Sequence, residues 1–191
     1  MLDDSRYAQP DGEKFILSPP LRKKADQDAL LFAMGAGKID FIGTDHCSFT
    51  MAQKALGGGE FSKVPNGAAG VQNRAQLIYT CAVRTGRITL PQMASLMSEN
   101  AAKFFGMYPH KGVLCEGADA DVTIYDPSGE GAISYRTNAH NCDNSPYEGM
   151  RVLGRVTDVL LGGEPIVRNG ALVREGAGRY VFRRPARRYR A

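Results

Sequence analysis

The sequence contains few of the residue types that bind a metal or form covalent cross-links, with three histidines and four cysteines in 191 residues. The cysteines are far apart and irregularly spaced, and none of them forms a CxxC pair. This spacing argues against a zinc knuckle and against a disulfide framework. We therefore expect four free thiols, at Cys47, Cys81, Cys115 and Cys142.

Long apolar runs and a secretory leader pattern are also missing. No stretch of 18 or more apolar residues occurs, and residues 1–14 (MLDDSRYAQPDGEK) lack the charged-then-apolar order of a signal peptide. We therefore expect no membrane contact and a cytoplasmic location. Because 43% of the 191 residues are hydrophobic, the chain can bury one core, or one core with a small satellite, which predicts a compact globular protein.

Positive charge is concentrated at one end of the chain. The net charge of +4 comes largely from residues 183–191 (RRPARRYRA), and the rest of the chain is close to neutral. Such a tail is more often a solvated end or a subunit-docking arm than a nucleic-acid contact. Because no basic face accompanies it elsewhere, we expect subunit contact and no nucleic-acid partner.

The first half of the chain alternates apolar runs with helical patterns. Residues 14–17 (KFIL) and 39–42 (IDFI) are predicted strands, and residues 24–34 between them have apolar side chains at helical spacing. This order is a βαβ unit, which indicates a parallel sheet covered by helices. Thr89 is the predicted N-cap of a later helix, with Pro91 in its first turn. The later helices are predicted at residues 72–84, 89–97 and 100–105.

The period of the apolar residues changes from helical to alternating after Gly112. The pairs Gly162-Gly163 and Asn169-Gly170 are hairpin signals, because both positions of such a turn need positive φ. They separate short runs of β-type residues. The predicted strands are residues 122–125, 156–161, 165–167 and 171–173.

Polar side chains follow both predicted strands of the βαβ unit. Ser18 comes directly after the first strand, and Asp45-His46 lies just past the second. Active sites of parallel α/β folds form at this edge. A carboxylate beside an imidazole can bind a metal or move a proton, and Asn66-Gly67 offers backbone groups in an open turn.

Each of these residues also has a purely structural interpretation. Ser18 can cap the next helix, Asp45 can cap the following turn, and His46 can face solvent or form a hydrogen bond inside the fold. Spacing alone favours the structural interpretation of the Asp45-His46 pair. The other histidines, His110 and His140, lie in loop-like contexts, and we expect them to be structural or exposed.

Several strings of the sequence, in this order, resemble dihydropyrimidinases and D-hydantoinases. They are residues 14–22 (KFILSPPLR), 41–49 (FIGTDHCSF), 61–70 (FSKVPNGAAG), 100–112 (NAAKFFGMYPHKG) and 116–127 (EGADADVTIYDP). Residues 144–150 (NSPYEGM) and a GRY string ending at Tyr180 extend the resemblance over residues 14–182. Linked motifs in a fixed order are far more specific than any one of them.

The resemblance implies an α/β fold, namely the C-terminal part of a (β/α)8 TIM-type barrel followed by a small β-sandwich-like domain. With the change of period near Lys111, this predicts a partial amidohydrolase barrel at residues 1–111 and a small β domain at residues 112–182. Residues 183–191 form the basic C-terminal tail. The resemblance also implies a homotetramer, because the family is commonly tetrameric.

The resemblance assigns roles to three residues. In such enzymes the aspartate of the GTDH motif, here Asp45, ligates one ion of a dinuclear zinc pair and takes the proton of the bridging hydroxide. The serine of the SPPLR motif and the asparagine of the PNG motif, here Ser18 and Asn66, bind the ring amide of the substrate. His46 is not a metal ligand in the family. The other ligands, an HxH pair, a carboxylated lysine and two histidines, lie upstream of the matched region in the family and are absent from this sequence.

Three functional hypotheses follow. The favoured one is a piece of a zinc-dependent cyclic amidohydrolase, which hydrolyses ring C–N bonds of dihydropyrimidines or hydantoins in pyrimidine catabolism and is inactive as this chain alone. The second is a non-catalytic scaffold or oligomerisation protein resembling the dihydropyrimidinase-like proteins, which have lost metal ligands. A scaffold does not need Asp45 or Asn66, so these residues favour the enzyme. The third, a free-standing β-rich binding module, does not explain the βαβ pattern.

Overall fold

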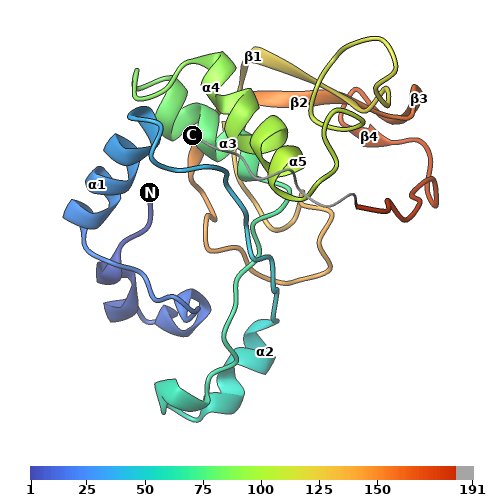
Figure 1. Cartoon of the computed structure of the whole chain (residues 1–191). Helices are drawn as coiled ribbons and strands as arrows, with labels where there is room; N and C mark the ends of the chain where they lie inside the picture. The colour runs from blue at the N-terminus through green and yellow to red at the C-terminus, as the bar shows by residue number, and fades with distance from the viewer. Residues whose placement is uncertain (184–191) are drawn as a thin grey trace.

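The structure, a computed structural model, describes residues 1–183 (Figure 1). Residues 184–191, most of the predicted basic tail, lie outside the described residues. A layer of helices packs against one antiparallel sheet, and two extended segments run side by side from this body to the short helix α2 (Met51–Lys54) (Figure 1). The chain is thus an α/β protein in which the helices precede the sheet.

Helices form where the apolar periodicity predicts them. The longer ones, with η marking single 3-10 or π turns, are α1 (Lys24–Gly35), α3 (Arg74–Ile78) continued by η5 (Tyr79–Val83), α4 (Leu90–Ala94) continued by η6 (Ser95–Glu99), and α5 (Asn100–Phe104). Thr89 caps α4 as predicted, since its hydroxyl accepts a hydrogen bond from the Gln92 N–H at 3.3 Å. No helix among residues 1–183 has the length and apolar character needed to cross a bilayer.

Short helical turns lie before α1 and between α1 and α3, and they are not predicted from the sequence. They are η1 (Asp4–Ala8), η2 (Gly12–Phe15), α2 with η3 (Ala55–Gly57), and η4 (Phe61–Lys63). Each has too few residues to show a helical period. Thr50 begins α2 with a side chain that accepts the Gln53 N–H at 3.2 Å. This region therefore depends on local caps rather than on an apolar face.

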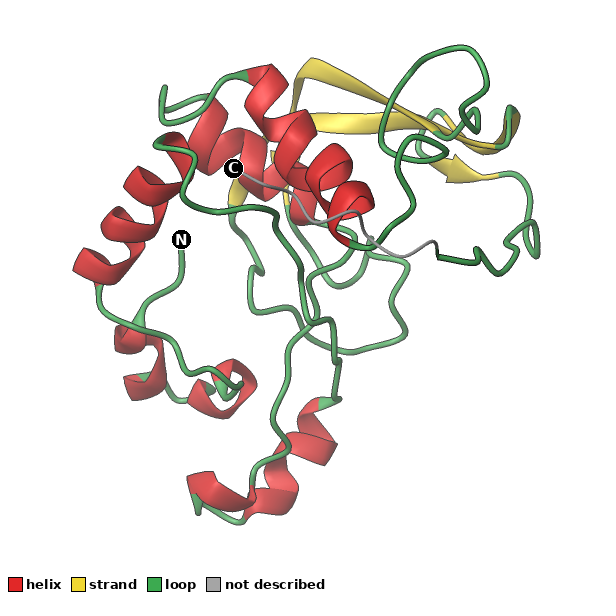
Figure 2. Ribbon diagram, in the orientation of Figure 1, coloured by secondary structure: helices red, strands yellow, loops and turns green. Residues whose placement is uncertain are grey.

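The strands after residue 112 form one four-stranded antiparallel sheet in the order β1-β2-β3-β4 (Figure 2). They are β1 (Val122–Ala132), β2 (Arg151–Leu161), β3 (Glu164–Arg168) and β4 (Ala171–Leu172). Both predicted hairpin turns are confirmed, with φ of 59° and 87° at Gly162 and Gly163, and of 50° and 77° at Asn169 and Gly170. β1 is longer than predicted because it continues past Pro127 after a shift in register, where proline cannot donate to the ladder.

A hydrophobic core joins the helices to the sheet. Its buried members are Leu31, Tyr79, Ala82, Ile88, Met93 and Leu96. Tyr125 of β1 and Leu153 of β2 pack against them, and the ring centroids of Tyr79 and Tyr125 lie 5.1 Å apart. Gly154 is required beside this contact, because its φ is 73° and a Cβ would lie 2.4 Å from the Tyr125 ring. The core crosses the boundary predicted near Lys111, and the division into domains stays a prediction.

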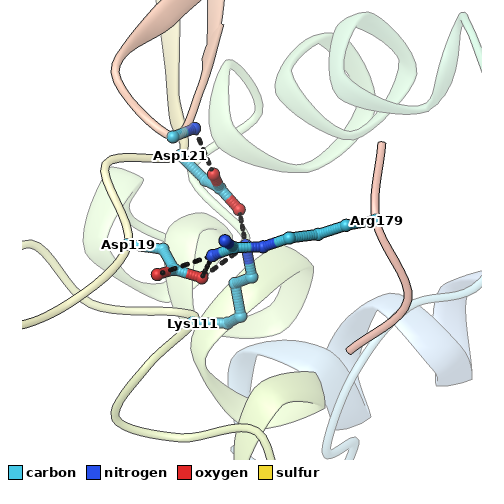
Figure 3. A network of polar contacts seen from close by, with 5 residues as sticks. Lys111, Asp119, Asp121 and Arg179 are labelled. Atoms are coloured by element: carbon cyan, nitrogen blue, oxygen red, sulfur yellow. Dashed lines mark hydrogen bonds and ion pairs between the residues drawn. The ribbon is translucent and has the colours of Figure 1, made fainter. Parts of the chain in front are cut away.

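Charged side chains connect that predicted boundary to the end of the described chain (Figure 3). Lys111 Nζ lies 2.9 Å from Asp119 Oδ2 and also pairs with Asp121. Partial burial alone lowers the pKa of Lys111, but its bonds to the two carboxylates raise that pKa above its usual value. Asp119 faces Arg179 at 3.5 Å, and Asp121 accepts the Gly162 N–H at 2.8 Å. The network holds three separate loops together.

The two predicted strands around α1 are wrong, although the helix between them is confirmed. Residues 14–17 and 39–42 do not pair as strands in the described chain. The Ile16 carbonyl instead accepts the Gly67 N–H at 3.1 Å, and the Ile42 N–H donates to a carbonyl of η6 at 3.0 Å. Lys14 and Phe15 belong to the 3-10 turn η2, and the bonds of Ile16 and Ile42 go to a loop and to a helix rather than to a neighbouring strand.

Candidate functional site

Three segments carry the predicted site residues and lie next to one another. They are the serine segment (residues 16–18), the asparagine loop (residues 65–70) and the aspartate segment (residues 44–47). The asparagine loop lies in the middle. Its Gly67 N–H donates to the Ile16 carbonyl of the serine segment at 3.1 Å, and its Ala68 carbonyl accepts the Cys47 N–H of the aspartate segment at 3.2 Å. The structure thus places the asparagine loop between the two other segments.

Ser18 and Asn66 line one open pocket with a volume of about 810 Å³. Phe61 and Lys54 contribute to the same lining. A concave surface of this size, with apolar walls and a few polar groups, is typical of small-molecule sites. Asp45 is not among the lining residues, so within the described residues the pocket brings together the predicted serine and asparagine but not the aspartate.

The polar groups of the three predicted residues are free to meet a ligand. Ser18, Asp45 and Asn66 are exposed, and within residues 1–183 neither their side chains nor the Asn66 backbone form a hydrogen bond or ion pair. The capping alternatives are wrong, because the N-cap of α1 is Lys23 and that of α2 is Thr50. A structural role in helix capping therefore does not account for Ser18 or Asp45.

His46 is a structural residue. Its Nδ1 accepts hydrogen bonds from the Gly70 N–H at 3.0 Å and the Val71 N–H at 3.2 Å. Because Nδ1 accepts, Nε2 carries the proton of the neutral ring. The His46 and His140 ring centroids lie 6.3 Å apart in an edge arrangement. Burial, and secondly the neighbouring His46, lower the pKa of His140.

The metal-binding residue types do not make up a complete site in the described chain. Among residues 1–183, no group of three or more His, Cys, Asp or Glu side chains could hold an ion. The exposed Asp45 carboxylate can supply one ligand, while zinc takes about four. The cysteines are free thiols, as predicted. A metal at Asp45 would need further ligands from outside the described residues.

The loop between β1 and β2 contacts the chain just after the aspartate segment. The Asn144 side chain donates to the Phe49 carbonyl at 2.8 Å, and the Asp143 carboxylate accepts the Met51 N–H at 2.9 Å. These two residues border or belong to the NSPYEGM string. The string contributes to the family resemblance, but its spacing gives no sign of which segment it contacts.

Lys54 is a candidate that the sequence does not reveal. Its side chain is fully buried, and Nζ donates to the carbonyls of Ile16 at 2.8 Å, Pro65 at 2.6 Å and Gly67 at 2.8 Å. Burial lowers the pKa of Lys54. Lysine is almost always exposed, so a single lysine in a helix too short to show a period carries no signal of burial.

Comparison with solved structures gives the class of the fold. The chain superposes on a dihydropyrimidinase from Brevibacillus agri NCHU1002 with a TM-score of 0.96 and 41% identity, over 99% of this chain and 42% of that chain. A D-hydantoinase (dihydropyrimidinase) from Thermus sp. matches with a TM-score of 0.94 and 39% identity, over 97% of this chain and 41% of that chain. The predicted class, part of an α/β barrel followed by a small β region, is confirmed.

The chain belongs to the amidohydrolase family, whose sequence profile matches residues 9–166. A D-phenylhydantoinase of Escherichia coli O1:K1 / APEC is 43% identical over 187 residues, which are 97% of this chain and 41% of that protein. The chain thus spans about 41% of the length of the curated relatives it matches. The family resemblance read from the motifs is confirmed, and members of this superfamily are in general metal-dependent.

Proposed function

We propose that this chain forms the C-terminal part of a cyclic amidohydrolase of the dihydropyrimidinase or D-hydantoinase type. Such a hydrolase opens the ring amide of dihydropyrimidines or hydantoins. The observation that carries the proposal is the side-by-side arrangement of three segments that expose Ser18, Asn66 and Asp45 with unpaired polar groups among the described residues. The names of the related D-phenylhydantoinase and dihydropyrimidinase support the same reaction class.

In this proposal Ser18 and Asn66 bind the substrate's ring amide. A cyclic amide presents an N–H and a C=O on neighbouring atoms, and it needs one acceptor and one donor from the protein. The Ser18 hydroxyl can act as either, and the unpaired Asn66 backbone offers both. Both residues line the pocket of about 810 Å³, which is large enough for a substituted small ring.

Asp45 is proposed as a metal ligand and a proton carrier. Zinc, when bound, would activate water and polarise the ring carbonyl. The Asp45 carboxylate would contribute one ligand, accept the proton released by the attacking water, and return it to the ring nitrogen as the C–N bond breaks. Because the other ligands of the family are absent from this sequence, we propose that the chain alone is inactive.

The oligomeric state and the cellular location of the complete enzyme are also part of this proposal. The complete enzyme would be a cytoplasmic homotetramer that acts on small cyclic amides, with no nucleic-acid or membrane partner. Residues 1–111 would complete the barrel edge, residues 112–182 would form the small β domain, and residues 183–191 would contact a neighbouring subunit. The proposed metabolic role of such an enzyme is pyrimidine catabolism.

A chimera tests this proposal directly. The upstream part of the Escherichia coli D-phenylhydantoinase is joined to residues 1–191, loaded with zinc, and assayed with hydantoin and with dihydrouracil. We expect formation of the ring-opened carbamoyl product well above the rate of the upstream part alone. A folded, zinc-loaded chimera without turnover would contradict the enzyme proposal and favour a scaffold.

A further inference from the structure

Lys54 is a buried cation without a carboxylate partner in the described chain. Its side chain is 1% exposed, and the ionisable groups that influence it are the thiols of Cys47 and Cys142 rather than an acid. Placing an ammonium away from water is costly unless its donors are all satisfied. The free energy for burying Lys54 must therefore come from the bonds that its Nζ forms.

The three bonds all go to backbone carbonyls beside predicted substrate residues. Pro65 and Gly67 directly precede and follow Asn66, and their carbonyls accept at 2.6 Å and 2.8 Å. The Ile16 carbonyl, in the serine segment, accepts at 2.8 Å and also receives the Gly67 N–H at 3.1 Å. One ammonium therefore joins both flanks of Asn66 to the serine segment.

The opposite side of the asparagine loop is equally constrained. Gly67 has a φ of 148°, and a Cβ there would lie 2.4 Å from the Cys47 carbonyl oxygen. The loop is thus pressed against the aspartate segment on one side and bonded to the Lys54 ammonium on the other. The Phe49 ring, with its centroid 5.4 Å from Nζ, covers the ammonium. Pro65 and Gly67 are thus bonded on both sides of Asn66, whose own backbone and side chain form no hydrogen bond within residues 1–183.

We propose that Lys54 is a positioning residue for substrate binding, which holds the asparagine loop against the serine segment so that Ser18 and Asn66 line one pocket. This inference rests on the proposed function of those two residues. Lys54 acts through the backbone carbonyls around them and takes no part in the chemistry at the ring. Its removal should therefore weaken substrate binding and leave the rate of the bound complex largely unchanged.

The first test uses the 191-residue chain. Lys54→Met keeps an unbranched apolar stem and removes all three donors. Hydrogen exchange of the Gly67 amide, measured by NMR, should become about tenfold faster or more, while exchange in α1 and α4 stays unchanged. Lys63→Met is the matched control, because Lys63 is 68% exposed and pairs with Glu60. Unchanged Gly67 exchange in Lys54→Met would overturn the proposal.

The second test uses the zinc-loaded chimera. Lys54→Met should raise KM about tenfold and keep kcat within about twofold, and Lys63→Met should change neither. A loss of kcat at unchanged KM would overturn the positioning role. If the unmutated chimera has no turnover, the proposed function fails, and Gly67 exchange still decides the role of Lys54.

A third measurement applies where Lys54→Met does not fold. The Nζ protons of Lys54 in the unmutated chain should then exchange with water far more slowly than those of Lys63, because three carbonyls hold them. Equal exchange at the two lysines would show that the three bonds are absent in solution and would overturn the proposal.

Discussion

His46 Nδ1 accepts the Gly70 N–H at 3.0 Å, so the residue next to Asp45 holds the far end of the loop that carries Asn66. Lys54 holds the near end through the carbonyls on either side of Asn66. The asparagine loop is therefore fixed by side chains at both ends. Between these contacts, the backbone and side chain of Asn66 form no hydrogen bond within residues 1–183.

We expect His46→Ala to lower the free energy of unfolding by about 0.5–1.5 kcal/mol, because two hydrogen bonds of a partly solvated ring are lost. Urea unfolding of the 191-residue chain measures this. His110→Ala is the control, because the His110 ring is exposed and forms no hydrogen bond within residues 1–183. Equal urea unfolding midpoints for the two variants would show that the hydrogen bonds of His46 contribute nothing to the free energy of unfolding.

Ser18→Ala in the chimera should act mainly on binding. If the ring amide loses its hydroxyl partner, the substrate-binding free energy weakens by about 1–3 kcal/mol. This loss corresponds to a KM roughly five- to 150-fold higher. Steady-state kinetics with hydantoin measure it. Ser62→Ala is the control, since the Ser62 hydroxyl bonds to the exposed Glu60. A Ser18→Ala chimera with the KM of the unmutated chimera would remove Ser18 from the substrate site.

The network around Asp119 predicts a pH dependence. The hydrogen bond from Lys111 holds the pKa of Asp119 below its usual value. A carboxylate whose pKa is lower in the folded state than in the unfolded state stabilises the folded state. This contribution is fully present above the unfolded pKa of about 3.9 and is lost as pH falls through the folded pKa. Unfolding free energy should therefore fall with acidification from about pH 4 downward, and less so in Asp119→Asn.

The same variant tests the contact of Asp119 with Arg179. At pH 7, hydrogen exchange in residues 173–182 should be roughly two- to fivefold faster in Asp119→Asn, as an exposed ion pair is lost. Asp28→Asn is the control, because Asp28 pairs with Lys24 on the surface of α1. If the two variants exchange alike in this segment, the network does not hold the C-terminal segment.

The 191-residue chain alone should retain no zinc after dialysis against a chelator and should not turn over dihydrouracil or hydantoin. Asp45 is a single ligand, and zinc affinity depends on about four. Metal analysis of the dialysed protein and a product assay measure this. Zinc retained at one or more ions per chain, or turnover above the blank, would contradict the expected dependence on upstream ligands.

Local signals account for what is predictable in this fold. α1, α4 and the two hairpins are recognised because their caps, apolar spacing and positive-φ residues lie within a few positions of one another. Residues 14–17 and 39–42 have strand-like composition, but a strand also needs a partner of the same kind. Here their backbone groups bond to the asparagine loop and to η6, which composition does not reveal.

In the candidate site, too, local motifs identify some residues, while a residue that acts through long-range contacts is missed. Motif order identifies Ser18, Asp45 and Asn66, and the structure finds all three exposed with free polar groups among residues 1–183. Motifs do not give Lys54, because its role depends on carbonyls 38 and 11 positions away at Ile16 and Pro65. Long-range contacts of a charged side chain with backbone leave no periodic trace in the sequence.

The central claim is that Asp45 carries the chemistry that this chain contributes to a cyclic amidohydrolase. Asp45→Ala removes a proposed metal ligand and the proposed proton carrier together. The decisive measurement is turnover of hydantoin by the zinc-loaded chimera that carries Asp45→Ala. Its control is Asp40→Ala, because Asp40 is an exposed aspartate directly before the 41–49 string. We predict a loss of at least about 10²–10⁴-fold in Asp45→Ala and little change in Asp40→Ala. Unmutated turnover in Asp45→Ala would contradict the account.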